Sequence, residues 1–256
     1  MARSETGPAW LVLPTYNEAE NIEPFVAAVR AKLPETAQIL IVDDNSPDGT
    51  GARADALAER HDNVNVLHRR EKEGIGPAYI AGFRRALAAG AGLVLEMDSD
   101  FSHDPAYLPR LLDASERADL VLGSRYVPGG GVGDWGPLRR AISRSGSAYA
   151  RLLLGVEVRD LTGGFKCFRR EVLEAIDLDS IQARGYAFQV EMTYRAIRHG
   201  FKVVEVPIVF RDRRVGSSKM DRSILVEAAW QVPRMRFGYR KREKPLTGVD
   251  ERRYTF

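Results

Sequence analysis

The chain has 256 residues, with 38 lysines and arginines against 35 aspartates and glutamates, and 44% of its residues are hydrophobic. This length suits one large domain or two small ones, and the composition excludes a wholly disordered chain. The single cysteine, Cys167, excludes an intramolecular disulfide framework and a zinc site built from a cysteine cluster. The sequence contains neither an apolar run of the about 18 residues that a membrane-spanning helix needs nor an apolar signal core at its N-terminus, so we expect a cytoplasmic protein.

The first half of the chain alternates short apolar runs with amphipathic stretches. The apolar runs predict strands at 10–13, 38–42, 63–67, 93–97 and 120–122. The amphipathic or alanine-rich stretches predict helices at 22–33, 50–59, 78–89 and 107–114. This alternation predicts an α/β fold with a Rossmann-like, mostly parallel sheet flanked by helices. Ligands of such sheets bind at the carboxyl ends of the strands, so the polar clusters after the first, second, fourth and fifth strands should face one crevice.

The second half is less regular. We expect a helix at 138–154, a turn at 161–168 that leads into a strand, and a strand at 203–210. A further helix should begin at 224–230 and end or kink at Pro233.

The strongest local signal is the pair Asp98 and Asp100 at the end of the fourth strand. Two carboxylates one residue apart can both bind one hard cation, and Mg²⁺ or Mn²⁺ held in this way completes its shell with water and substrate phosphate oxygens. The alternative is a solvated turn whose aspartates cap the following helix. The position of the pair, in the expected crevice beside three other polar loops, favours the metal site.

Two of those loops carry groups that suit a nucleotide. The loop after the first strand offers the ring of Tyr16, the amide of Asn17 and the carboxylate of Glu18. Asp43 and Asp44, after the second strand, can accept hydrogen bonds from a base edge or a ribose hydroxyl. The alternative for both loops is turn formation and helix capping.

Basic residues are the candidates for neutralising phosphate groups. The segment 210–219 follows a strand, contains Gly216 and three serine or lysine neighbours, and carries four basic residues that can fold over a diphosphate. A basic surface loop is the alternative there. Arg125, after the fifth strand, is a further cation directed at the crevice.

The predicted helix at 138–154 has a cationic stripe formed by Arg140, Arg144 and Arg151. It is either an ordinary surface helix or an interfacial helix whose cationic face binds lipid phosphate. The segment 234–244 contains six lysines and arginines and one glutamate. A membrane surface fits it better than nucleic acid, because no nucleic-acid recognition motif occurs elsewhere.

Six motifs taken together resemble one enzyme family. They lie, in chain order, at 14–18, 42–50, 97–103, 123–127, 162–165 and 216–219. In sequence and order they resemble the dolichol-phosphate mannosyltransferases, within the family 2 glycosyltransferases of the GT-A fold, over about residues 10–220. The resemblance implies a flexible N-terminus at 1–8, a GT-A domain at 9–220, an amphipathic basic segment at 221–240 and a mobile tail at 241–256.

The resemblance also implies an activity and roles for residues. The activity is the transfer of mannose, with inversion, from GDP-mannose to a polyprenyl phosphate. Asp98, Asp100 and Arg125 would be catalytic, and the two aspartates would bind Mg²⁺ or Mn²⁺. Ser102 stands where relatives often have a glutamine as a third metal ligand, which leaves that place to the serine hydroxyl or to water. The donor would contact Pro14, Tyr16, Glu18, Val42, Asp43, Asp44, Asp98, Ser99, Asp100, Arg213 and Lys219, and the acceptor phosphate Arg125, Arg139 and Ser143.

The chemistry of this reaction suits the sequence. An acceptor phosphate is already anionic at pH 7, so catalysis can rest on positioning and on charge neutralisation without a strong general base. Some relatives carry C-terminal membrane spans that this chain lacks, so its lipid contact at the inner face of the plasma membrane should be peripheral or aided by a partner protein. Two alternatives stay open: a UDP-glucose-dependent polyprenyl-phosphate glucosyltransferase, and a non-catalytic module that binds anionic lipid.

Overall fold

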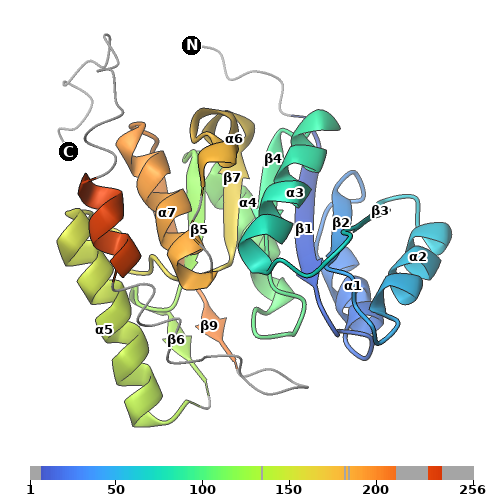
Figure 1. Cartoon of the computed structure of the whole chain (residues 1–256), viewed down its shortest axis with the longest axis horizontal. Helices are drawn as coiled ribbons and strands as arrows, with labels where there is room; N and C mark the ends of the chain where they lie inside the picture. Colours follow the sequence, from blue (N-terminus) through green and yellow to red (C-terminus); the bar gives the residue numbers. More distant parts are fainter. Residues whose placement is uncertain (1–6, 134, 182, 184, 212–229, 238–256) are drawn as a thin grey trace.

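The computed structural model describes residues 7–133, 135–181, 183, 185–211 and 230–237 (Figure 1). Its elements are, in chain order, β1 (Ala9–Thr15), α1 (Ile22–Arg30), β2 (Gln38–Asp43), α2 (Thr50–Arg60), β3 (Val64–His68), α3 (Ile75–Ala88), β4 (Leu93–Glu96), η1 (Pro105–Tyr107), α4 (Leu108–Ser115), β5 (Leu120–Ser124), β6 (Gly131–Val132), α5 (Pro137–Leu154), β7 (Lys166–Arg169), α6 (Arg170–Ala175), η2 (Leu178–Ser180), α7 (Gly185–Arg198), β8 (Val203–Pro207) and β9 (Val209–Phe210).

Seven strands form one sheet in the order β3-β2-β1-β4-β7-β5-β8. Strand β7 runs antiparallel to β4 and β5, and the other neighbouring pairs are parallel. The predicted mostly parallel α/β architecture is therefore confirmed. The strand expected at 203–210 is instead two strands, because Ile208 donates to the Ser124 carbonyl and accepts from Gly131, which moves the chain from β5 onto β6.

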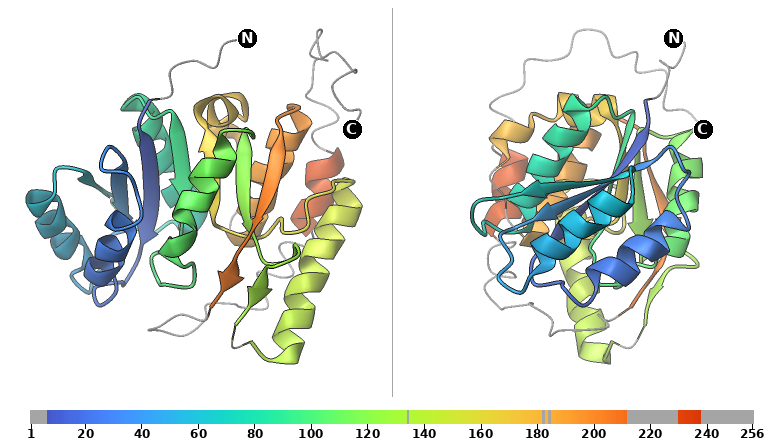
Figure 2. Two further views of the ribbon diagram at one scale, coloured as in Figure 1. Left: turned by 180° about the vertical axis from the view of Figure 1, so that it is seen from behind. Right: turned by 90° about the vertical axis from the view of Figure 1, so that its right-hand side faces the viewer.

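Helices cover both faces of the sheet (Figures 1 and 2). Alternate residues of β1 pack on opposite faces of the sheet. Val12 belongs to the hydrophobic cluster that contains residues of α3 and α7, and Leu11 to the cluster that contains residues of α1, α2 and α4. Helix α3 lies very close to β1, since a Cβ atom at Gly82 would be 2.3 Å from a methyl of Val12. Both faces of β1 are therefore buried over residues 10–13.

Helix α7 is the main element that the sequence analysis missed. Its polar residues Gln189, Glu191, Thr193 and Arg195 are all buried, so polar side chains occur on its inner face and blur the helical period. Helix α5 agrees with the prediction and ends at Gly155, whose φ of 68° suits a glycine. Residues 230–237 are all helical, so the chain does not leave the helix at Pro233.

Several predicted segments lie outside the described residues. These are most of the predicted N-terminal segment, the basic loop beyond Arg211, the helix start expected at 224–229, and the segment and tail beyond residue 237. Within the described part of the chain, no helix is both long and apolar enough to cross a membrane.

Candidate active site

The loops after β1, β2 and β4 meet where the strand order reverses, between β1 and β4. The Ser99 hydroxyl donates to the Pro14 carbonyl at 3.2 Å, which joins the β4 loop to the β1 loop. The backbone NH of Asn17 donates to the Ser46 hydroxyl at 3.1 Å, which joins the β1 loop to the β2 loop. The loops after the first, second and fourth strands therefore lie side by side at this sheet edge, where open α/β sheets bind ligands.

Each of these three loops contains a non-glycine residue with positive φ. Asn17, Asn45 and Phe101 have φ values of 57°, 59° and 62°. A bulky residue such as Phe101 is rare in this region, and such strain gathers at functional sites. An edge-to-face contact with Phe25, with the ring centroids 4.9 Å apart, holds Phe101 in place. The backbone of the crevice is thus specified by its packing.

The two aspartates after β4 are held by different partners. Asp98 Oδ1 accepts a hydrogen bond from the Tyr79 hydroxyl at 3.0 Å, and its side chain is 27% exposed. Burial, followed by the charge of Asp98, raises the pKa of Tyr79 well above its usual range, so this hydroxyl stays a donor. Asp100 is buried, and its Oδ1 accepts from the Ser102 backbone NH at 2.9 Å and the Ser102 hydroxyl at 2.5 Å.

This donor set fits a hard divalent cation with few protein ligands. The described residues contain no group of three or more His, Cys, Asp or Glu side chains placed to hold a metal. Two carboxylates are enough for Mg²⁺ or Mn²⁺ when phosphate oxygens and water complete the shell. Ser102, expected near a third ligand position, directs its hydroxyl to Asp100 and so orients that carboxylate.

A buried ion pair lies at the end of β4, directly before the loop that carries the two aspartates. Lys166 of β7 lies opposite Glu96 of β4, with Nζ 3.2 Å from Oε1, and both side chains are completely buried. Lys166 also donates to the backbone carbonyl of Gln189 at 3.1 Å and to its side-chain oxygen. Burial raises the pKa of Glu96 and lowers that of Lys166, while their mutual attraction opposes both shifts. A charged residue in each of two apolar strands was the signal that could have revealed this pair.

The residues predicted to bind a nucleotide lie at the same edge, and several have structural partners. Asp44 accepts from the backbone NH groups of Glu73 and Gly74 at 3.2 and 3.0 Å, just before α3, and pairs with Arg69. Asp43 accepts from the Ser46 backbone NH at 3.3 Å. Turn formation and capping, the alternative considered for this loop, thus occupies these carboxylates.

The remaining residues predicted to bind the nucleotide sugar differ in the groups that they expose. The Tyr16 ring lies under Lys72, with Nζ 3.7 Å from the ring centroid. The Glu18 carboxylate accepts from the Asn21 amide at 2.8 Å. Val42 is fully buried with its side chain in the core, so only its backbone could face a ligand, and its carbonyl accepts from Thr15 at 3.3 Å. Arg213 and Lys219 lie outside the described residues.

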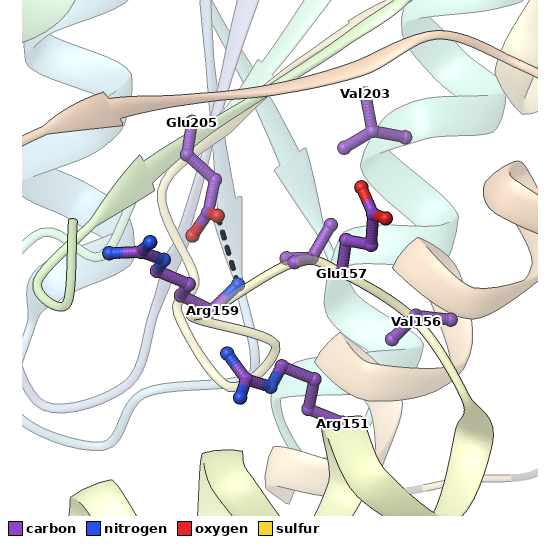
Figure 3. Close-up of a pocket in the computed structure, with 7 residues that line it drawn as sticks. Arg151, Val156, Glu157, Arg159, Val203 and Glu205 are labelled. Carbon is purple, nitrogen blue, oxygen red and sulfur yellow. Dashed lines mark hydrogen bonds between the residues drawn. The ribbon is translucent and has the colours of Figure 1, made fainter. Parts of the chain in front are cut away.

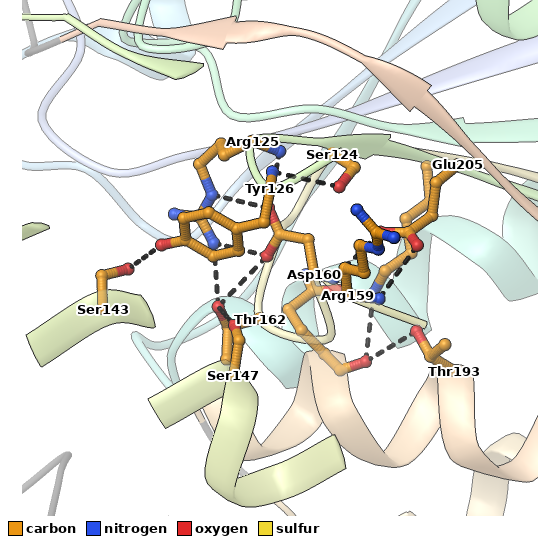
Figure 4. Close-up of polar contacts among 12 residues, drawn as sticks. Ser124, Arg125, Tyr126, Ser143, Ser147, Arg159, Asp160, Thr162, Thr193 and Glu205 are labelled. Carbon is orange, nitrogen blue, oxygen red and sulfur yellow. Dashed lines mark hydrogen bonds and ion pairs between the residues drawn. The ribbon is translucent and has the colours of Figure 1, made fainter. Parts of the chain in front are cut away.

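Arg125 forms a bidentate ion pair that the sequence analysis did not foresee (Figure 4). Its Nε and Nη2 donate to the two carboxylate oxygens of Asp160, both at 2.7 Å, and Nη2 also reaches the Thr162 hydroxyl at 2.8 Å. Both partners are buried. Burial alone would raise the pKa of Asp160, but the charge and hydrogen bonds of Arg125 outweigh it and lower that pKa. The expectation of a cation directed at the crevice is therefore revised, because Asp160 compensates the charge of Arg125.

Helix α5 contacts the loops that follow β5 and β6. The Tyr126 hydroxyl donates to the Ser143 hydroxyl at 2.6 Å (Figure 4). The Arg139 guanidinium lies 4.1 Å from the centroid of the Trp135 ring. Arg139 and Ser143, predicted to bind the acceptor phosphate, thus lie on the helix face that packs against these loops.

His103 lies beside Asp98. Its ring is buried against Phe165 and Phe210, and its Nε2 is 3.9 Å from Asp98 Oδ2. Burial lowers the pKa of His103 to about 4, so the imidazole is neutral at pH 7. A neutral ring adds no positive charge beside the carboxylates.

A pocket of about 640 Å³ lies beyond the β8 edge (Figure 3). It is lined by Arg151, Val156, Glu157, Val158, Arg159, Val203 and Glu205, and does not include the aspartates. Glu205 accepts from the backbone NH groups of Arg159 and Asp160, both at 2.9 Å. Glu205 therefore holds the turn that presents Asp160 to Arg125.

Comparisons with known proteins identify the family of the chain. The model of the glycosyl transferase family 2 matches residues 10–177. The chain is 49% identical over 223 residues to the undecaprenyl-phosphate mannosyltransferase of Micrococcus luteus, covering 87% of this chain and 91% of that protein. It is 49% identical over 241 residues to the polyprenol monophosphomannose synthase of Mycolicibacterium smegmatis, covering 93% and 90%.

Solved structures share the fold. A glucosyl-3-phosphoglycerate synthase from Mycobacterium tuberculosis, in complex with Mn²⁺, UDP and glucosyl-3-phosphoglycerate, superposes with a TM-score of 0.65 at 20% identity, covering 90% of this chain and 80% of that one. The same enzyme with Mn²⁺, UDP and phosphoglyceric acid gives a TM-score of 0.64 at 20% identity, covering 88% and 78%. The chain therefore has the GT-A-like fold of these glycosyltransferases.

Proposed function

Given that the chain belongs to glycosyl transferase family 2, we propose that it transfers mannose from GDP-mannose to a polyprenyl phosphate with inversion at the anomeric carbon. The observation that carries the proposal is the pair Asp98 and Asp100 at the point where the strand order reverses. The two relatives at 49% identity support the sugar and the acceptor.

Asp98 and Asp100 would hold Mg²⁺ or Mn²⁺. When bound, such an ion neutralises charge on the donor diphosphate and on the departing GDP. The protein's own contribution is orientation: Tyr79 fixes Asp98, and Ser102 fixes Asp100. A rigid pair of carboxylates reduces the reorganisation needed when the metal and the donor bind.

The donor would lie along the loops after β1 and β2. Tyr16 offers an aromatic face to the guanosine, and the carboxylate of Glu18 and the backbone near Pro14, Val42 and Ser99 offer hydrogen-bonding groups. Asp43 and Asp44 would shape this loop through their backbone partners. Arg213 and Lys219 would add positive charge at the diphosphate, as the sequence motifs suggest.

The acceptor phosphate would bind on the α5 side, at Arg139 and Ser143. Arg125 would act by positioning, since Asp160 holds its guanidinium in place beside Tyr126. A phosphate acceptor needs no proton removed at pH 7, which agrees with a neutral, buried His103 beside the aspartates.

Helix α5 would also face a membrane. Leu138, Ile142, Tyr149 and Leu152 are exposed and fall on one stripe of the helix, with Leu138 74% and Leu152 85% exposed. An apolar stripe with Arg140, Arg144 and Arg151 on roughly the opposite face is the pattern of a helix that lies in the interface of an anionic bilayer. We propose peripheral binding at the inner face of the plasma membrane, with or without a membrane-anchoring partner protein.

A transfer assay tests the proposal. The full chain is incubated with GDP-mannose or UDP-glucose, a short polyprenyl phosphate, and Mg²⁺ or Mn²⁺. We expect mannosyl transfer that is abolished by a chelator and by Asp98→Ala or Asp100→Ala. Transfer from UDP-glucose alone would replace the proposed donor, and full activity of either variant in chelator would refute the metal site. Vesicle binding without any transfer would support a purely lipid-binding module instead.

A further inference from the structure

Trp135, between β6 and α5, is a buried aromatic residue whose polar atom lacks a partner. The residue is 5% exposed, and its indole Nε1 is enclosed without a hydrogen-bond acceptor among the residues that the structure describes. A buried tryptophan NH usually finds an acceptor, because leaving it unpaired costs about 1–3 kcal/mol. The position of Trp135 therefore calls for an explanation.

The surroundings of Trp135 point towards the reaction centre. Its ring makes an edge contact with Phe210, with centroids 5.4 Å apart, and Phe210 contacts His103 at 5.0 Å. The next residue, Arg211, donates its backbone NH to the Ser102 carbonyl at 3.0 Å. Trp135 is thus linked through one strand to the loop that carries Asp98 and Asp100.

A cationic hydrogen-bond donor lies against the indole ring. The Arg139 guanidinium stacks on the ring at 4.1 Å, and Ser143 lies one helical turn further along α5. An indole NH beside a guanidinium offers donors of the kind that bind phosphate oxygens. An anionic ligand would satisfy the NH and gain from the neighbouring charge.

We propose that Trp135 Nε1 donates a hydrogen bond to the phosphate monoester of the acceptor, next to Arg139. The inference rests on the proposed function and adds a binding residue to its acceptor site. The indole would contact the phosphate through its NH, and its ring would hold the Arg139 guanidinium in place. No bond is made or broken by this residue.

Trp135→Phe is the direct test, because it removes the NH and keeps an aromatic ring for Phe210 and Arg139. With GDP-mannose saturating, we expect the KM for farnesyl phosphate to rise about ten-fold or more, as for a lost hydrogen bond to a charged group, with little change in the KM for GDP-mannose. The matched control is Trp10→Phe, since Trp10 also has an enclosed, unpartnered Nε1 but lies in the core. That control should leave both KM values unchanged.

A binding measurement keeps the test independent of turnover and of the folding of Trp135→Phe. The chain has three tryptophans, so a Trp10→Phe, Trp230→Phe double variant retains Trp135 as its one indole fluorophore. Its emission should change in a saturable way with farnesyl phosphate, weakly with inorganic phosphate, and not with farnesol. A response to inorganic phosphate as strong as to farnesyl phosphate would assign the site to free phosphate.

The outcomes separate the two proposals. An acceptor KM within two-fold of wild type, or an emission that does not respond to farnesyl phosphate, would overturn the role of Trp135 while mannosyl transfer by the wild type stands. A rise in the KM for GDP-mannose alone would assign the NH to the donor and also overturn it. Absence of transfer by the wild type would refute the proposed function, and the fluorescence titration would still decide whether Trp135 binds a phosphate monoester.

Discussion

The Arg125–Asp160 ion pair should contribute strongly to stability, and its removal gives a measurable magnitude. Asp160 is completely buried, Arg125 is 7% exposed, and two hydrogen bonds of 2.7 Å join them. Removing one partner of a buried pair leaves the other charge unpaired and costs about 3–5 kcal/mol. For a chain of this size each kcal/mol lowers Tm by about 2–4 °C, so Asp160→Asn should lower it by roughly 6–20 °C.

A double-mutant cycle separates the pair from its surroundings. Urea unfolding of Asp160→Asn, Arg125→Met and the double variant should give a coupling free energy of about 2–3 kcal/mol, because the second substitution removes the unpaired charge left by the first. The control is Glu23→Gln, which breaks a half-exposed ion pair with Arg60 at 2.9 Å and should cost less than about 1 kcal/mol. If Asp160→Asn costs no more than this control, the structural role argued for Arg125 is wrong.

The same pair predicts a pH dependence. The pKa of Asp160 is lowered in the folded chain, whereas an unfolded aspartate titrates near about 3.9. The contribution of the Asp160 carboxylate to the free energy of unfolding is therefore complete above the pKa of the unfolded aspartate. It is lost as the pH falls below that value and through the lower pKa of the folded chain. Asp160→Asn should lack this part of the acid sensitivity in urea titrations between pH 5 and pH 3.

Three further predictions concern single residues. Tyr79→Phe removes the hydrogen bond to Asp98 and should weaken Mn²⁺ binding in the presence of GDP by about ten-fold, measured by electron paramagnetic resonance of free Mn²⁺. Tyr194→Phe on α7 is the control for the loss of a buried hydroxyl, and equal Mn²⁺ affinity of Tyr79→Phe and wild type would contradict the role of Tyr79. Cys167 is fully buried with its pKa raised to about 12, so it should resist thiol reagents in the native protein and react fully in denaturant; rapid labelling of the native protein would be inconsistent with this burial. Burial lowers the pKa of His103 to about 4, whereas an unfolded histidine titrates at about 6.5. Lowering the pH from 7.5 to 5 in EDTA should therefore reduce the free energy of unfolding of wild type by about 2 kcal/mol more than that of His103→Gln. An equal loss in both proteins would argue against a buried neutral ring.

Local patterns were sufficient for most of the sheet and for the position of the aspartate pair proposed to bind metal. The strands β1, β2 and β4 are short apolar runs bounded by turn residues, so their ends could be placed within about two residues. Asp98 and Asp100 directly follow such a strand, and the rule for parallel sheets then brings them to the crevice. Helix α7 was missed because its inner face carries the buried residues Gln189 and Arg195, whose side chains bond to Lys166 and to the Ile176 carbonyl in other elements.

The proposed acceptor side depends on contacts that no local pattern reveals. Asp160 is 35 residues from Arg125, and Glu205 holds the Asp160 turn from 45 residues further along the chain. A single arginine after a strand indicates an available cation, and only the folded chain places a carboxylate against it. In the proposed function, Arg139 of α5, which stacks on Trp135, would supply charge to the acceptor phosphate.

The change of strand pairing at Ile208 explains how the two sides of the proposed site are joined. A continuous strand at 203–210 would keep Phe210 in the main sheet beside β5. Because the chain instead crosses to β6, Phe210 contacts both His103, beside the aspartates, and Trp135, in the proposed acceptor site. The following backbone NH binds the Ser102 carbonyl, and Ser102 in turn holds Asp100. Strand β9 and the residue after it therefore contact both the loop that carries the carboxylates and Trp135, on which Arg139 of α5 stacks.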